Sequence, residues 1–328
     1  MAGTYKATGI NLKGIPLGES DRLLTVLTRE FGLIRVVAPG ARKHQSSLRG
    51  RSGLFVVNEL LIAKGRSLDK IIQAESLESY PSLSQDLRKL TASQYIAELV
   101  LYQALSDQPQ DELFDLLNQL LSLIERLPGA TTLALLVQAV FHLLTLAGVA
   151  PQVNNCCLTQ QALMPDLMNS DWRVGFSASA GGTVDMAALK QSLSRPIKAK
   201  ERLSTQRQSV SLSTVSYPFA RQSGKVVQGA IASSEVTHRS YSSPDFIAHL
   251  DAIQLTLLQR LAQSDLPQAG QPIQPPEQSL PTPVSDNVWL SIERVLRNYA
   301  QYHFEKSIRS ATLVDTCFLS TPPLSPEP

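Results

Sequence analysis

The sequence predicts an α+β fold, in which an N-terminal five-stranded barrel is followed by an α-helical domain. Three observations carry this prediction. The first 80 residues form short apolar runs separated by turn residues, leucines recur at helical spacing from residue 81 on, and prolines gather in two late segments. A length of 328 residues allows two or three domains at roughly 100–200 residues each.

The strand-like runs of the first 80 residues are bounded by turn residues. Residues 29–32 end in Gly32, which is suited to the positive φ of a hairpin turn, and residues 65–67 form a second turn. Five short strands in this span favour a small barrel of the OB or SH3-like type. The five predicted strands span residues 5–13, 22–28, 33–38, 55–64 and 68–74.

Leucine and isoleucine recur at helical spacing after Pro81. The segment 107–110 interrupts this pattern, and we expect Asp111 to cap the helix that follows. The helices that we expect span about residues 83–104, 111–127, 130–150, 245–262 and 286–309.

The stretch 130–150 carries no charged residue and is long enough to cross a membrane, for which about 20 apolar residues suffice. Polar residues such as Gln138 and His142 interrupt it, and no basic cluster or aromatic belt flanks it. We therefore expect a helix buried on all sides, with His142 as a hydrogen-bonded core residue and no membrane partner.

Prolines mark the segments that we expect to lie outside the packed domains. Half of the 20 prolines fall within residues 265–283 and the last nine residues. The expected organisation is a barrel domain (1–80), a helical domain with a cysteine region (81–189), a basic Ser/Gln-rich insert (190–240), C-terminal helices that complete the helical domain (241–310) and are interrupted by the Pro-rich linker 265–283, and a disordered tail (311–328).

Positive charge is concentrated in two segments although the net charge is only +2. Residues 1–80 hold 12 Lys+Arg against 7 Asp+Glu, and the insert holds 9 against 2. Residues 39–51, here called the basic loop, carry Arg42, Lys43, Arg49 and Arg51, and no acidic residue occurs between Phe31 and Asn58.

Each basic side chain of such a loop can displace a counterion from a phosphate. Arg35 precedes the basic loop, and Lys64 and Arg66 add charge at the second hairpin. A mobile loop without a partner fits the composition equally well, but its position on a barrel favours nucleic acid. The candidate DNA-binding residues are Arg35, Arg42, Lys43, Arg49, Arg51, Lys64 and Arg66.

No catalytic residues, cofactor or metal site are assigned. The sequence holds no P-loop, no G-x-G-x-x-G after a strand and no H-E-x-x-H, and its S-x-x-K and S-D-N matches lack the K-T-G that would accompany them. The three cysteines, Cys156, Cys157 and Cys317, cannot form a disulfide framework and fit a reducing cytosol. No secretory signal is visible in residues 1–20, so we expect a cytoplasmic protein. Because no motif combines a nucleophile, a base and an orienting group, we do not expect an enzyme.

Several segments resemble the bacterial recombination mediator family RecO. The likeness is carried by residues 5–13, 17–25 and 28–32, by Ala38-Pro39-Gly40-Ala41-Arg42-Lys43 in the basic loop, by residues 143–151, and by residues 297–303. Residues 176–177 and 180–182 resemble the segment between the family's cysteine pairs. The similarity covers residues 1–189 and about 243–310, and the basic loop is its most specific part.

The resemblance implies an N-terminal OB-fold and a helical domain without an enzyme active site. It also implies binding of single- and double-stranded DNA at the nucleoid and annealing of strands. The partners that it implies are RecR and single-stranded DNA-binding protein, whose tail is acidic, with RecA loaded indirectly. The DNA-contacting loop carries over onto Arg35, Arg42, Lys43, Arg49 and Arg51.

Two features depart from the family pattern. Many members bind zinc with two C-x-x-C pairs, whereas here the first pair is replaced by adjacent Cys156-Cys157 and the second is absent, which predicts no zinc. The second departure is the insert 190–240, for which a solvated tether is favoured over a further DNA contact.

Two other functions stay open on the sequence alone. An OB-fold protein that binds RNA or ribosomes has the same charge pattern, and a scaffold could dock an acidic peptide on the basic loop. With only Tyr5, Phe31, Phe55 and Tyr80 as aromatic residues in the first 80, we expect nucleic acid to be bound mainly through phosphates.

Overall fold

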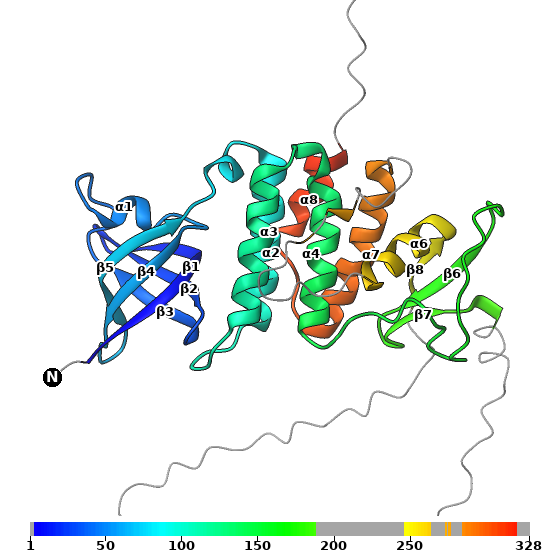
Figure 1. The fold of residues 1–328 in the computed structure, drawn as a ribbon, viewed down its shortest axis with the longest axis horizontal. Helices are drawn as coiled ribbons and strands as arrows, with labels where there is room; N and C mark the ends of the chain where they lie inside the picture. The colour runs from blue at the N-terminus through cyan, green and yellow to red at the C-terminus, as the bar shows by residue number, and fades with distance from the viewer. Residues whose placement is uncertain (1–2, 188–245, 264–272, 274, 277–283, 320–328) are drawn as a thin grey trace, which may run out of the picture.

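The computed structural model describes residues 3–187, 246–263, 273, 275–276 and 284–319. The basic insert 190–240 and most of the linker 265–283 lie outside the described residues. Along the long axis, a barrel is followed by a group of helices and then by a small sheet (Figure 1). The α+β architecture predicted from the sequence is confirmed.

The first 80 residues form a closed five-stranded barrel with the strand order β1-β2-β3-β5-β4. β1 is longer than predicted: its residues 4–10 pair with β4, its residues 9–17 pair with β2, and the register with β2 shifts at a bulge between Asn11 and Lys13. Gly32 takes the predicted positive φ, at 62°. The strands are β1 (Thr4–Leu17), β2 (Asp21–Thr28), β3 (Gly32–Ala38), β4 (Val57–Ala63) and β5 (Asp69–Glu78).

The barrel has its own apolar interior, but one side of it belongs to the helical core. Leu24, Val26, Val36, Leu60 and Ile62 are among the side chains that fill the interior. By contrast, five other barrel side chains belong to the apolar core of the helical domain: Ile10, Leu12, Leu27, Phe55 and Val57. Burying one shared core fixes the orientation of the barrel against the helices.

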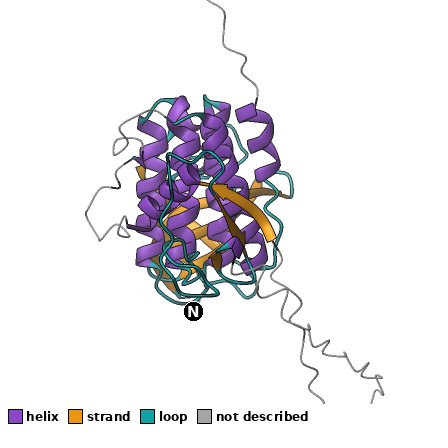
Figure 2. Ribbon diagram, turned by 90° about the vertical axis from the view of Figure 1, so that its right-hand side faces the viewer, coloured by secondary structure: helices purple, strands orange, loops and turns teal. Residues whose placement is uncertain are grey.

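The helices form a bundle beyond the barrel, in which α4 contacts α2, α3, α6 and α7 (Figures 1 and 2). α2 begins after Asp86, whose carboxylate accepts hydrogen bonds from the backbone N–H groups of Arg88 and Lys89. The helices of this domain are α2 (Leu87–Gln103), α3 (Asp111–Arg126), α4 (Thr132–Leu146), α6 (Ala252–Gln263), α7 (Asp286–Phe304) and α8 (Ala311–Leu319), and a 3₁₀ turn at Pro81–Ser84 precedes them.

Asp111 does not cap α3 as predicted. Gln110 occupies the cap position and makes no side-chain capping bond, and Asp111 is the first helical residue. There its carboxylate lies 3.8 Å from the Arg29 guanidinium, so the acidic side chain serves the contact with the barrel.

The C-terminal region is more ordered than predicted, because residues 311–319 form α8 where we expected a disordered tail. Phe318 is buried, and Asp315 accepts hydrogen bonds from Arg294 (2.9 Å) and Arg297 (2.8 Å) of α7. Arg297 also pairs with Glu293, whose side chain is fully buried; burial raises the pKa of Glu293 although Arg297 opposes the shift. Residues 311–319 contain no proline, and Ala311, Val314 and Phe318 recur at helical spacing, which is the signal that the prediction missed.

A three-stranded sheet that the sequence did not predict lies at the other end of the molecule. β6 (Arg173–Ser177) pairs with β7 (Gly182–Val184) and with β8 (Phe246–Asp251). The helix expected at 245–262 therefore begins only at Ala252, and its first predicted turns are a strand. The partners of β8 are about 70 residues away in the chain, which local patterns do not reveal.

α4 is the buried central helix predicted from the uncharged stretch 130–150. The segment Gly129–Leu146 is long and apolar enough to cross a membrane by composition, but 72% of it is buried inside the fold, as expected of a core helix. His142 lies in this core, and burial lowers its pKa to about 4.

The turn between β2 and β3 is locked into the loop between α2 and α3. The backbone N–H of Leu33 donates to Leu105 (2.8 Å), and that of Asp107 donates to Phe31 (3.0 Å). Arg29 lies 4.4 Å from the ring centroid of Phe114 and pairs with Asp115. A side chain at Gly32 would place its Cβ 2.1 Å from the Leu105 carbonyl oxygen, so only glycine fits at this junction.

Replacing Gly32 with alanine should destabilise the protein by more than about 2 kcal/mol, because the clash with Leu105 adds to the cost of a positive φ. Gly18→Ala is the matched control, since Gly18 has a φ of 60° and nothing within 4 Å of the added Cβ. Denaturant unfolding measures both variants. Equal losses in the two would show that the contact with Leu105 contributes nothing.

Because of His142, the free energy of unfolding should decrease as the pH is lowered from about 6.5 to 4. Its folded pKa lies below its ordinary value, so the unfolded chain binds the proton first and stability is lost as the pH falls through this window. His142→Gln should flatten this part of the pH profile, whereas His44→Gln, at an exposed histidine, should not. An unchanged slope in His142→Gln would contradict the assignment.

Candidate nucleic-acid interface

The basic loop is an ordered cap on one end of the barrel. Ala41 and Leu48 point into the barrel interior and are almost fully buried, and α1 (Leu48–Arg51) forms one helical turn beside β5. Anchors at two points of the loop hold the polar residues between them in place. The loop thus contributes burial to the barrel, although most of its residues are polar.

Side-chain hydrogen bonds fix the start of the basic loop to the turn between β1 and β2. The carboxylate of Asp21 accepts from the Gly40 N–H (2.8 Å) and from the Ser20 hydroxyl (2.8 Å). These bonds, with the positive charges of Lys43 and Lys70, lower the pKa of Asp21. The Arg42 guanidinium donates to the Gly18 carbonyl (2.8 Å), which holds this cation against the tip of the hairpin.

Two buried asparagines fix the end of the basic loop. The side-chain amides of Asn11 and Asn58 both donate to the carbonyl of Arg51, at 2.8 and 3.0 Å, and Asn11 also donates to Gly53. Both asparagines are 1% exposed, so these bonds form away from water. Their role could not be predicted from the sequence, because an asparagine in a strand is not a recognisable motif.

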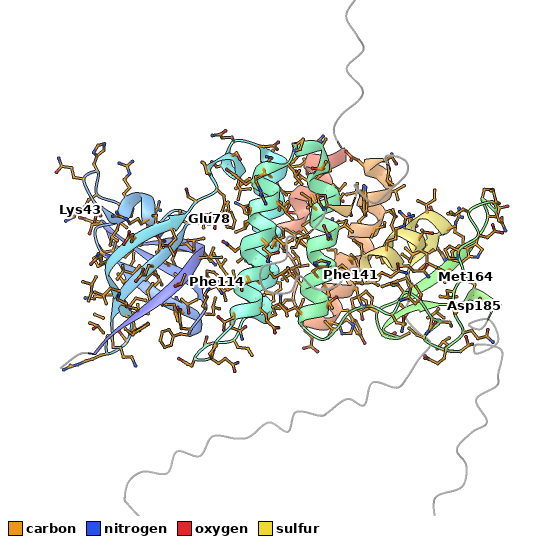
Figure 3. All side chains as sticks on the ribbon, viewed as in Figure 1. Lys43, Glu78, Phe114, Phe141, Met164 and Asp185 are labelled. Atoms are coloured by element: carbon orange, nitrogen blue, oxygen red, sulfur yellow. The ribbon has the colours of Figure 1, made fainter. Side chains whose placement is uncertain are left out.

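The structure gathers four of the seven predicted cations at the capped end of the barrel. Arg42, Lys43 and Arg49 are exposed and Arg51 is half-buried, with its guanidinium donating to the Ser47 carbonyl (2.8 Å). Lys43 lies at the outer end of the molecule, next to α1 (Figure 3). Within the described residues, none of the four forms a salt bridge, so their charge is available to an anion.

The other three predicted cations lie apart from the cap. Arg35 is on the outer surface of β3, opposite Thr25. The backbone N–H of Lys64 donates to Gly3, and its ammonium lies 5.9 Å from the ring centroid of Tyr5. Lys64 and the neighbouring Arg66 therefore lie by the start of β1, and the structure does not join them to the basic loop.

Lys70 is a cation that the sequence analysis missed. Its register partner is Val37, one residue before the end of β3, and its charge contributes to lowering the pKa of Asp21, as that of Lys43 does. The alternation of β5 could have found it, since Ile71 points into the barrel and Lys70 must point outward.

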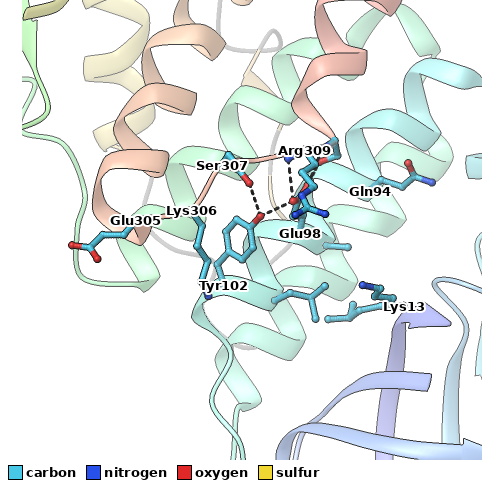
Figure 4. A pocket seen from close by; sticks show the side chains of 12 residues that line it. Lys13, Gln94, Glu98, Tyr102, Glu305, Lys306, Ser307 and Arg309 are labelled. Carbon is cyan, nitrogen blue, oxygen red and sulfur yellow. Dashed lines mark hydrogen bonds between the residues drawn. The ribbon is translucent and has the colours of Figure 1, made fainter. Parts of the chain in front are cut away.

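A groove of about 650 Å³ separates the barrel from the helical domain (Figure 4). Lys13 of β1 lies on one side of it, and Lys306 and Arg309 of the α7–α8 connection lie on the other. Glu98 lies between them and accepts hydrogen bonds from Tyr102 and from the backbone of Arg309 and Ser310. Burial acts to raise the pKa of Glu98, but these bonds outweigh it and lower the pKa, so its carboxylate serves to join α2 to this connection.

The two adjacent cysteines lie near the three-stranded sheet. Cys156 is fully buried, and its Sγ accepts a hydrogen bond from the backbone N–H of Asp185 (3.2 Å). Among the described residues there is no group of three or more His, Cys, Asp or Glu side chains that could hold a metal ion. Apolar contacts of Cys156 with Val184, and the hydrogen bonds of the strands, hold this region together.

Comparison with known proteins gives one consistent family. The sequence model described as "Recombination protein O N terminal" matches residues 1–80, and "Recombination protein O C terminal" matches residues 84–198. A protein of Cyanothece sp. named "DNA repair protein RecO" is 53% identical over 99% of each chain. Proteins with the same name from Nostoc sp. and Gloeothece citriformis are 49% identical (97% of each chain) and 50% identical (96% of this chain, 98% of the relative).

Purified protein should contain well under one zinc ion per chain, because two adjacent thiols cannot supply a tetrahedral site. Metal analysis by mass spectrometry after dialysis, together with a four-cysteine zinc protein as a positive control, measures the content. Zinc near one equivalent that survives dialysis would contradict this prediction.

Proposed function

The chain belongs to the RecO family of DNA repair proteins, and from that premise we propose that it is a non-enzymatic recombination mediator. In this role it binds single- and double-stranded DNA, anneals complementary single strands, and helps to load RecA onto DNA that is coated by single-stranded DNA-binding protein. RecR and the acidic tail of single-stranded DNA-binding protein are its proposed partners, and the nucleoid in the cytoplasm is its proposed location.

The observation that carries the proposal is the cationic cap of the barrel. The basic loop presents Arg42, Lys43, Arg49 and Arg51 on a backbone held by Asp21, Asn11 and Asn58. Cations that are already in place lose little conformational freedom when they bind phosphates. This supports electrostatic binding that is independent of base sequence.

Phosphate contacts at the cap also suit annealing. A strand held by its backbone keeps its base edges free to pair with a second strand. The described residues bring together no nucleophile with a base and an orienting group at this cap, which supports a role in binding over one in catalysis. Arg35, Lys64 and Arg66 are proposed as further contacts, and the structure leaves them outside the cap.

An RNA- or ribosome-binding function is the alternative that shares the same charge pattern. The membership of the family supports DNA, because the matched relatives are named for DNA repair. Direct competition of DNA and RNA of the same sequence for the protein distinguishes the two.

Replacing Lys43 and Arg49 with alanine should weaken binding of single-stranded DNA of any sequence. Among the described residues, these two cations have no side-chain hydrogen-bond partner, so their removal leaves the loop anchors in place. Each lost phosphate contact lowers the slope of log affinity against log salt by about 0.7, so the slope should fall by up to about 1.4. Fluorescence anisotropy across a salt series measures it.

The matched control is Arg126→Ala with Arg173→Ala, which removes the same charge from exposed positions of the helical domain and the small sheet. This control should keep the wild-type slope. If both double variants lose slope equally, the effect comes from net charge and the cap is not the binding site.

A further inference from the structure

The register of the barrel assembles a surface that the basic loop does not include. Direct partners across antiparallel and parallel strands point to the same side of a sheet. One row across the outside of the barrel consists of Ile15, Leu23, Val37 and Lys70, on four successive strands. The next row consists of Lys13, Thr25 and Arg35. We call these two rows, together with Leu17, the outer face.

Alternation along the strands confirms the direction of these side chains. Leu24, Val26 and Val36 belong to the barrel interior, so Leu23, Thr25 and Val37 point outward. Leu23 and Val37 are nevertheless only 7% and 5% exposed, whereas Ile15 and Leu17 are 42% and 38% exposed. The exposed aliphatic side chains of the outer face are thus Ile15 and Leu17 of β1, here called the ridge, and Leu23 and Val37 beside them are buried.

Cations surround this ridge. Lys13, Arg35 and Lys70 are exposed and, within the described part of the chain, form no salt bridge. Arg42 is held at the carbonyl of Gly18, next to Leu17 in the chain. Asp21 also points to this side, but its carboxylate accepts the N–H of Gly40 and lies near Lys43 and Lys70.

We infer that the outer face holds the unpaired bases of a single DNA strand on Ile15 and Leu17, while Lys13, Arg35 and Lys70 contact its phosphates. This inference rests on the proposed function and extends it. A purely cationic cap does not distinguish single strands from duplexes, whereas exposed aliphatic side chains contact bases only where these are unpaired. Aliphatic contacts lack the geometric preference of aromatic stacking, so the bases are held without being fixed.

The same arrangement explains how a strand can be bound firmly and still anneal. Bases lying on an aliphatic ridge bury part of one π-face, while their Watson–Crick edges stay in solvent. A second strand can pair with them, and the resulting duplex loses the apolar contact. The outer face therefore favours the substrate of annealing over its product.

The test compares wild type with a double variant that carries both Ile15→Thr and Leu17→Thr. Binding is measured on three probes of equal length: an oligothymidine strand, an abasic strand, and a duplex. Threonine keeps the β-branched shape that suits a strand, and thermal melting checks the fold. Leu77→Thr, at an exposed leucine of β5, is the matched control. Affinity for oligothymidine should fall by about tenfold, as expected for two lost apolar contacts. Affinity for the abasic strand and the duplex should change by less than about twofold.

A second variant, Lys13→Ala with Lys70→Ala, tests the phosphate contacts. It should lower the salt slope on both single-stranded probes by up to about 1.4. Unchanged oligothymidine binding in the threonine variant, or equal losses on all three probes, would overturn the assignment of bases to the ridge. An unchanged slope in the lysine variant would overturn the assignment of phosphates.

These outcomes are separate from failure of the proposed function. If the outer-face variants bind normally while Lys43→Ala with Arg49→Ala loses slope, the cap binds DNA and the outer face does not. If no variant changes DNA binding, both proposals fail. Loss of binding to purified RecR or to single-stranded DNA-binding protein, with DNA affinity unchanged, would assign the outer face to a protein and overturn the inference.

Discussion

The shared core between the barrel and the helices is the constraint on which the rest of the structure depends. Three barrel side chains pack among the side chains of the helices: Ile10, Leu27 and Phe55. In addition, the β2–β3 turn is hydrogen-bonded to the α2–α3 loop. Because Gly32 has no side chain, the Leu105 carbonyl packs directly against its backbone, and the two domains meet in one orientation. The other end of the barrel is thereby turned away from the helices, and this is the end that the basic loop caps (Figure 1).

Buried polar groups then determine the shape of the cap. Asn11 and Asn58 contribute amide N–H groups that would be costly to leave unpaired, and the carbonyl of Arg51 satisfies both. Asp21 does the same for the N–H of Gly40 at the start of the loop. The backbone positions of the cations thus follow from hydrogen bonds of neutral and acidic neighbours, and only Arg42 and Arg51 add a hydrogen bond of their own side chain.

Local patterns predicted most of the fold, because alternation, turn glycines and leucine spacing are local properties. The barrel, its two hairpins and the buried helix α4 were all visible in this way. The residues of β8 predict the start of a helix because the partner strand β6 lies far away in the chain. α8 escapes prediction because part of its stability comes from the contacts of Asp315 with Arg294 and Arg297. At the candidate site, sequence found the basic loop but not Lys70 or the two asparagines, whose roles exist only once the strands are paired.

The most direct test of the account is the rate at which two complementary oligonucleotides anneal when each is first coated with single-stranded DNA-binding protein. The account predicts that the wild-type protein accelerates annealing in the presence of the coat, and that the acceleration falls when Lys43 and Arg49 are replaced with alanine. Annealing that is no faster with the protein than without it, or equal acceleration by both forms, would contradict the claim that the cationic cap of the barrel makes this protein a mediator.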